Sequence, residues 1–199
     1  MSAIDILASL NGFDVNSLEP LQRVLLVTDG TLTEILEANF FERIRLVKIS
    51  QNVISATASH GLLDPNPGEV LIERKILLQG EGSHRNYAYA ESLIAVARLD
   101  PSFRNELLDS DTPLGRLWLE HRLETFKELQ EVRCQRANGL CRYFECDGAA
   151  PLLVRTYRVF SASRPVMVIT ESFPAAYPHS ARKVSLRSLR LDLVPPDES

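Results

Sequence analysis

The segment that most restricts the fold is an alternating run between glycines, GEVLIERKILLQGEG at residues 68–82. Alternation of this kind is typical of a β-strand, in which every second side chain shares a face. One face of this strand carries four apolar residues with Arg74 at its centre. A guanidinium among apolar side chains is costly unless an anion meets it. The run therefore predicts a buried Arg–Glu pair, an edge strand whose arginine reaches water, or an anion-binding site.

Other strand-like segments lie on both sides of this run. They cover residues 43–53, 87–96, 152–160 and 165–173. Residues 124–134 fit either a helix or a strand, and we favour the strand. The polar stretch 161–164 is typical of a hairpin turn between the last two strands. Because strands and helices do not alternate regularly, the sequence predicts an α+β fold with a single antiparallel sheet.

Several short helices are predicted by their start signals. Pro20 favours one helix start, and Thr31 with Glu34 matches a capping box that opens a second helix at Leu32. Thr112-Pro113 predicts another start at Leu114. The first amides of a helix have no intrahelical partner and bind anions readily. The first two helices, separated by a short break, would form a helical hairpin or lid.

A second apolar strand face also contains one charge, Glu171. Together with Arg74 and the amides at Leu32 and Leu114, it would complete a site for an acid that carries a hydroxyl group. Glu171 could meet that hydroxyl or move a proton. The alternative is structural, because Arg74 could simply pair with Glu171.

Composition argues against several classes of function. The chain has 199 residues, enough for one domain, and a net charge of −4 that does not favour nucleic-acid binding. Its three cysteines and four histidines lack metal-ligand spacing, so we expect neither a disulfide scaffold nor a metal. Phosphate-binding glycine loops and nucleophile-elbow motifs are absent, so we expect no nucleotide cofactor.

The hydropathy pattern predicts a soluble protein. No apolar run approaches the ~20 residues that a membrane helix needs. The N-terminal segment lacks a basic region and carries Asp5, which argues against a secretory signal. We therefore expect a cytoplasmic protein that has no contact with membranes.

Six stretches carry a family resemblance. They are VTDGTLTEILE at 27–37, ERKILLQGEG at 73–82, NYAYAESLI at 86–94, TPLGR at 112–116, RTYR at 155–158 and RPVMVITESFP at 164–174. In their order and spacing the chain resembles the chorismate lyases, the chorismate pyruvate-lyases that make 4-hydroxybenzoate. It looks most like the branch of photosynthetic and some other bacteria. The resemblance extends over roughly residues 20–174, so we expect a domain at 1–174 and a partly mobile extension at 175–199.

The resemblance implies a small antiparallel sheet with helices on one side and lid helices over a buried site, without cofactor or metal. It implies that Arg74 binds the ring carboxylate and that Glu171 contacts the 4-hydroxyl end. The amides at Leu32 and Leu114 would help to hold the carboxylate. The sequence departs from the enterobacterial enzymes at Leu32, where they have methionine, and at Tyr89 and Glu91, where they have an arginine–threonine pair.

The implied reaction is loss of pyruvate from chorismate, which aromatises the ring. The protein would hold the reactive conformer and exclude water. Glu171 could act as a general acid toward the leaving group or only position the hydroxyl. The second substrate carboxylate needs a cation, and Arg155 or Arg158 could supply it, although either could equally lie on a solvated strand face. The product would enter quinone synthesis, with plastoquinone the expected end product.

The chief alternative is a binding module. The same fold serves as the effector-sensing domain of UTRA-type transcription regulators, and a degenerate homologue could bind 4-hydroxybenzoate without turnover. Only about twenty residues precede the resembling region, which leaves no room there for a DNA-binding domain, so we favour the enzyme. Its partners would be chorismate and 4-hydroxybenzoate, and a monomer is the expected state.

Overall fold

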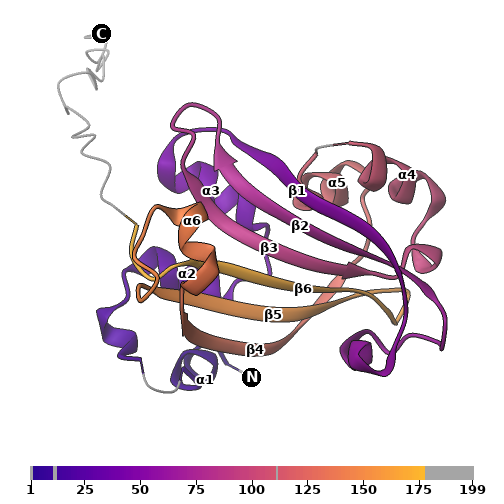
Figure 1. Cartoon of the computed structure of the whole chain (residues 1–199), viewed down its shortest axis with the longest axis horizontal. Coiled ribbons are helices and arrows are strands. Elements are labelled where there is room, and N and C mark those ends of the chain that lie inside the picture. The colour runs from indigo at the N-terminus through magenta and orange to yellow at the C-terminus, as the bar shows by residue number, and fades with distance from the viewer. Residues whose placement is uncertain (1, 11–12, 111, 178–199) are drawn as a thin grey trace, which may run out of the picture.

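The computed structural model describes residues 2–10, 13–110 and 112–177. Six strands form one antiparallel sheet in the order β1-β2-β3-β6-β5-β4 (Figure 1). The strands are β1 (Ile44–Ser55), β2 (Val70–Gly80), β3 (Asn86–Ile94), β4 (Phe126–Arg136), β5 (Pro151–Ser161) and β6 (Arg164–Pro174). The helices are α1 (Ala3–Ala8), α2 (Pro20–Val27), α3 (Leu32–Phe40), α4 (Pro101–Asp109), α5 (Leu114–Glu120) and α6 (Cys141–Phe144). The predicted α+β class with a single antiparallel sheet is confirmed.

Turn chemistry and strand pairing explain the last three strands. Ala162 and Ser163 both have positive φ, 48° and 61°, as a two-residue hairpin turn between twisted strands requires. The ambiguous segment 124–134 lies within β4, because its residues pair with β5 from Phe126 to Arg136. Long-range pairing therefore decides in favour of the strand where local periodicity does not.

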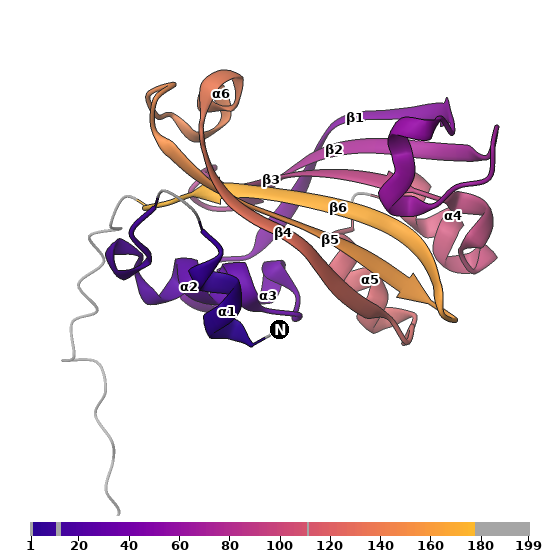
Figure 2. The same cartoon turned by 90° about the horizontal axis from the view of Figure 1, so that it is seen from below.

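The helices cover mainly one side of the sheet. Figure 2 shows α1, α2, α3 and α5 on one side and the short helix α6 on the other. α2 begins at Pro20, and α3 begins at Leu32, as predicted. The predicted capping box is wrong in its bonding, because the Thr31 side chain makes no cap hydrogen bond and its hydroxyl donates to the Glu34 carboxylate instead. The first amides of α3 therefore have no side-chain cap.

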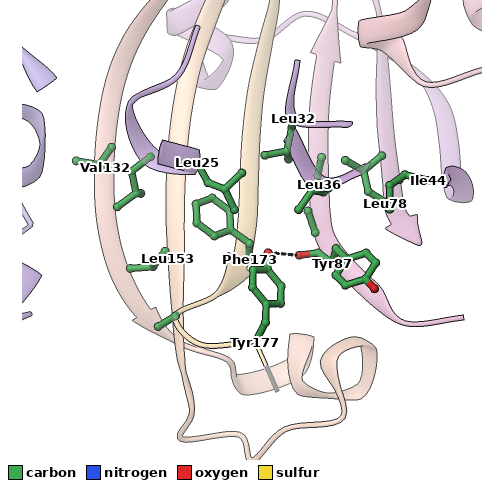
Figure 3. Packing of buried hydrophobic residues seen from close by; sticks show 14 of the residues in the cluster. Leu25, Leu32, Leu36, Ile44, Leu78, Tyr87, Val132, Leu153, Phe173 and Tyr177 are labelled. Atoms are coloured by element: carbon green, nitrogen blue, oxygen red, sulfur yellow. Dashed lines mark hydrogen bonds between the residues drawn. The ribbon is translucent and has the colours of Figure 1, made fainter. Parts of the chain in front are cut away.

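Two apolar clusters fill the space between the sheet and these helices. The first packs α1, α2 and α3 against the sheet and includes Leu25, Leu36, Leu153 and Phe173 (Figure 3). The second packs α4 and α5 against the other end of the same face and includes Phe103, Leu117, Trp118, Val159 and Ile169. The boundary between the two clusters is the seam in which buried polar side chains lie.

The packed part of the chain continues beyond β6. Ala175 and Tyr177 are buried, and the Tyr177 hydroxyl donates to the Tyr87 carbonyl at 2.8 Å. These residues, at the start of the expected extension 175–199, thus belong to the folded core. The remainder, residues 178–199, lies outside the described part of the chain.

Arg98 clamps the long connection between β1 and β2. Its guanidinium forms a bidentate pair with Glu69, at 2.8 and 2.7 Å, and also donates to the carbonyls of Leu63, Asp64 and Pro165. The Arg98 and Glu69 side chains are only 6% and 11% exposed. The clamp therefore joins this connection to the start of β6.

Replacing Arg98 by Met removes the cation paired with Glu69 and the donor to three carbonyls, so we expect a loss of about 3–5 kcal/mol in the free energy of unfolding. The control is Arg133→Met, since Arg133 pairs with Glu131 at the surface, where such pairs contribute ~1 kcal/mol or less. Urea denaturation measures both. Equal stabilities for the two variants would contradict the clamp.

Candidate active site

Four polar side chains are buried in the seam on the helix-covered face of the sheet. Arg74, Ser92, Arg155 and Glu171 are 3%, 9%, 2% and 6% exposed. Arg74 pairs with Ser92 across β2 and β3, and Glu171 pairs with Arg155 across β6 and β5. Residues directly opposite each other in antiparallel strands share a face. Ser92 also pairs with Ile169, two residues from Glu171 along β6, so Arg74 and Glu171 lie on one face of the sheet. Each is on the apolar strand face that alternation predicts.

The carboxylate of Glu171 is held by its neighbours on β5. Arg155 Nε donates to Glu171 Oε2 at 2.5 Å, and the Tyr157 hydroxyl donates to Oε1 at 2.9 Å. Burial, together with the charge of Glu171, raises the pKa of Tyr157 well above its ordinary value, so this residue remains a neutral donor. The structural alternative was a direct pair between Arg74 and Glu171, but the structure pairs Glu171 with Arg155 instead. Both oxygens of Glu171 therefore accept a hydrogen bond from a side chain of β5.

Arg74 lies at the other end of the seam, beside α4. Its Nη1 donates to the Leu107 carbonyl at 3.3 Å, in the last turn of that helix. The carbonyl end of a helix favours a cation. Arg74 is almost fully buried, so its charged end faces the interior rather than solvent.

The N-termini of α3 and α5 meet over the same part of the sheet. Residues 31–33 and 113–115 line one cavity of about 60 Å³ together with Ser92, Ile169 and Glu171. Neither helix has a side-chain cap, so their first amides are available to a ligand. The structure thus brings the predicted residues Leu32, Leu114 and Glu171 together around one cavity.

A larger cavity of about 440 Å³ lies beside the small one. Its lining includes Thr28, Lys127, Arg155 and Tyr157, and two of these, Lys127 and Tyr157, also line the small cavity. A cavity that holds a benzene ring measures roughly 150 Å³. The small cavity must therefore widen, or join its neighbour, to admit an aromatic acid.

The connector between α2 and α3, residues 28–31, lies beside both cavities and is held by two cations. Arg155 Nη1 donates to the Thr28 carbonyl at 2.8 Å. Lys127 Nζ donates to the carbonyls of Asp29 and Gly30 at 2.7 and 3.0 Å. This arrangement gives the predicted helical lid a defined attachment to the site.

Lys127 is a site residue that the sequence analysis missed. Its Nζ lies 5.1 Å from the ring centroid of Trp118 and 5.6 Å from that of Tyr157. Burial lowers the pKa of Lys127, and the charge of Glu171 partly offsets this effect. Lys127 is two residues from Leu129, so in a strand the two side chains share a face. Because the segment fitted either a helix or a strand, this spacing did not identify Lys127 as a site residue.

Arg158 lies away from the cavities. It is three residues from Arg155 and so points to the opposite face of β5, where its Nη2 pairs with Glu128 Oε2 at 2.6 Å. Tyr89 and Glu91 likewise do not line the small cavity, and the Tyr89 hydroxyl donates to Glu91 at 2.5 Å while its ring stacks on Tyr143 of α6. Of the two arginines considered for the second carboxylate, only Arg155 is at the site.

Within residues 2–10, 13–110 and 112–177, no group of three or more His, Cys, Asp or Glu side chains could hold a metal ion. No helix in the same ranges is long and apolar enough to cross a membrane.

Comparison with known sequences identifies a family. Residues 26–180 match the model of a family described as "Chorismate pyruvate-lyase Rv2949c-like". A chorismate pyruvate-lyase of Mycobacterium tuberculosis is 32% identical over 156 residues, which cover 76% of this chain and 78% of the relative.

Comparison with solved structures identifies the fold. PhnF from Mycobacterium smegmatis superposes with a TM-score of 0.59 at 12% identity, over 77% of this chain and 70% of that one. The C-terminal domain of the histidine utilization repressor from Pseudomonas syringae pv. tomato gives 0.53 at 16% identity, over 70% and 98%. At such identities the likeness concerns the fold alone.

The contact between α3 and α5 depends on Gly115. A Cβ there would lie 2.5 Å from Thr31 Cγ2 and 2.9 Å from Thr31 Cβ. We expect Gly115→Ala to force the two helix starts apart and to cost about 1–3 kcal/mol in the free energy of unfolding. Gly139→Ala is the control, because a Cβ at Gly139 meets no atom within 4 Å. Thermal or urea unfolding that ranks both variants alike would contradict this packing.

Proposed function

The chain belongs to the Rv2949c-like chorismate pyruvate-lyase family, and we propose that it eliminates pyruvate from chorismate to give 4-hydroxybenzoate. One observation carries the proposal beyond family membership. A fixed carboxylate, Glu171, and two uncapped helix N-termini, at Leu32 and Leu114, face one cavity, and Arg74 lies in the same seam without lining that cavity. These groups suit an acid whose opposite end carries a hydroxyl.

In this proposal Arg74 and the helix amides bind the ring carboxylate. Arg74 lies directly opposite Ser92, which lines the cavity, although Arg74 itself is not among the lining residues. The proposal places the ring carboxylate at that end of the cavity, beside Ser92. A guanidinium forms strong, often bidentate, hydrogen bonds to a carboxylate. The amides at Leu32 and Leu114 add donors from the lid side.

Glu171 then accepts a hydrogen bond from the 4-hydroxyl. Both of its oxygens already accept a hydrogen bond, Oε2 from Arg155 and Oε1 from the Tyr157 hydroxyl, so the carboxylate is held in the role of an acceptor. This supports a positioning role over the general-acid role. Arg155 acts through Glu171 by fixing its orientation.

In this proposal the protein accelerates the reaction mainly by orienting the substrate rather than by transferring a proton. The bond between ring C3 and the ether oxygen breaks, ring C4 loses its hydrogen, and the enolpyruvyl methylene gains one hydrogen to become the methyl of pyruvate. Aromatisation of the ring supplies driving force. The protein contributes by holding the reactive conformer beneath the connector 28–31 and by excluding water.

We infer that 4-hydroxybenzoate supplies quinone synthesis in the cytoplasm. Plastoquinone as the end product, a place in the branch of photosynthetic bacteria and a monomeric state stay predictions. The second candidate function is a non-catalytic sensor of an aromatic acid, because the same groups around the cavity would bind such an acid without turnover.

The experiment that tests the activity is incubation of the purified protein with chorismate. We expect 4-hydroxybenzoate and pyruvate in equal amounts. In the same assay, Glu171→Gln keeps an acceptor for the hydroxyl and should retain activity within ~10-fold, whereas Glu171→Ala should lose ~100-fold or more. Equal, large losses in both variants would contradict positioning and favour the general acid. Absence of both products, with tight binding of aromatic acids, would favour the sensor.

Product binding tests the role of Arg74. The single tryptophan, Trp118, lines the cavity, so its fluorescence reports occupancy. We expect Arg74→Met to weaken 4-hydroxybenzoate binding by ~10-fold or more, because a charge-assisted contact is lost. Arg158→Met, on the opposite face of the sheet, is the control and should bind as the wild type does. Unchanged affinity in a folded Arg74→Met variant would refute the assignment.

A further inference from the structure

Three cavities meet at one side chain, Lys127. It lines the small cavity that contains Glu171 and the cavity of about 440 Å³ beside it. It also lines a third, of about 340 Å³, between the connector and α5, where Gly30, Gly115 and Trp118 contribute. The ammonium group of Lys127 therefore lies where the buried site adjoins its larger neighbours.

The charge of Lys127 is solvated by the protein but not neutralised by it. Its hydrogen bonds go to the backbone carbonyls of Asp29 and Gly30, and the rings of Trp118 and Tyr157 face it. None of the ion pairs found across the described ranges includes Lys127. Carbonyl dipoles and ring faces stabilise a cation without cancelling its charge. An ammonium group has three donors, and the two carbonyls use two.

Arg155, the other cation at this end, differs in this respect. Its Nε is paired with Glu171 and its Nη1 with the Thr28 carbonyl. The charge of Arg155 is balanced by a carboxylate, and its removal from Glu171 would leave two buried charges unpaired. An incoming anion therefore finds a better partner in Lys127 than in Arg155.

The strand register places Arg74 and Lys127 at opposite ends of the site. One row across five strands consists of Arg74, Ser92, Ile169, Tyr157 and Leu129. Lys127 is two residues from Leu129 along β4 and shares its face. The small cavity lies between, with Ser92 and Lys127 both in its lining. A ligand that follows this row meets a cation at each end.

Chorismate has a carboxylate on the ring and another on the enolpyruvyl group. We propose, on the basis of the function inferred above, that Lys127 binds the enolpyruvyl carboxylate and so makes the site selective for the dicarboxylic substrate over the monocarboxylic product. Arg74 takes the ring carboxylate at the far end. An interaction with the substrate that the product cannot make also favours product release.

The proposal links ligand binding to the connector 28–31. The ammonium that meets the second carboxylate is the one that holds the carbonyls of Asp29 and Gly30. Burial lowers the pKa of Lys127, which reflects poor hydration of its ammonium group. A carboxylate at the third donor then compensates for the missing water.

The test compares two stable ligands. One is 4-hydroxybenzoate, and the other is 3-(carboxymethoxy)-4-hydroxybenzoate, an aromatic diacid whose second carboxylate is on an ether at ring position 3. Trp118 fluorescence and isothermal titration calorimetry measure both affinities. Lys127→Met should weaken binding of the diacid by ~10-fold or more, through loss of a charge-assisted hydrogen bond, and leave binding of the monoacid within ~2-fold. Lys127→Arg should recover part of the diacid affinity.

The matched control is Lys75→Met, the same change on the outer face of the sheet, where Lys75 pairs with Glu91 at 3.8 Å. It should alter neither affinity. Equal weakening of both ligands by Lys127→Met, unchanged diacid affinity, or failure of the wild type to bind the diacid would each overturn the inference.

Turnover separates this inference from the function on which it rests. If the wild type converts chorismate and Lys127→Met has an unchanged KM, the inference fails and the lyase stands. If the wild type gives no products but Lys127→Met selectively loses the diacid, the lyase fails and the dicarboxylate site stands.

Discussion

The contact between Arg155 and Glu171, buried between neighbouring strands, governs the geometry of the site. Removing both charges from water is costly, and the pair is stable only because its remaining polar atoms also find partners. The Tyr157 hydroxyl and the Thr28 carbonyl provide them. One interaction therefore fixes the carboxylate and attaches the connector between α2 and α3 to the sheet.

The site occupies the boundary between two hydrophobic clusters. One lies beneath α1 to α3 and the other beneath α4 and α5. Polar groups placed in the centre of either cluster would have no partners, whereas at the boundary they meet one another and the uncapped N-termini of α3 and α5. Gly115 lets those two helix starts approach closely. The architecture thus gathers polar groups around a small cavity without interrupting either cluster.

Local patterns in the sequence predicted the faces of the strands and the starts of the helices. Alternation placed Arg74 and Glu171 inside, and the start signals gave Leu32 and Leu114. These patterns could not predict that Arg155 is the partner of Glu171. Strand register depends on long-range pairing and on bulges, such as the one between Leu129 and Glu131. Lys127 was missed for a related reason, since a lysine in an ambiguous segment resembles a solvated residue. Arg155 and Arg158 are three residues apart in one strand, so only one of them can face the site, but the sequence does not say which. Arg158 was therefore retained as a candidate.

A crystal structure with 4-hydroxybenzoate bound tests the central claim most directly, namely that this seam is the substrate site. The account predicts the ring beneath the connector 28–31, with its carboxylate on Arg74 and the helix amides and its hydroxyl against Glu171, while Arg155 keeps its contact with Glu171. A ligand bound elsewhere, with Arg74 and Glu171 untouched, would contradict it.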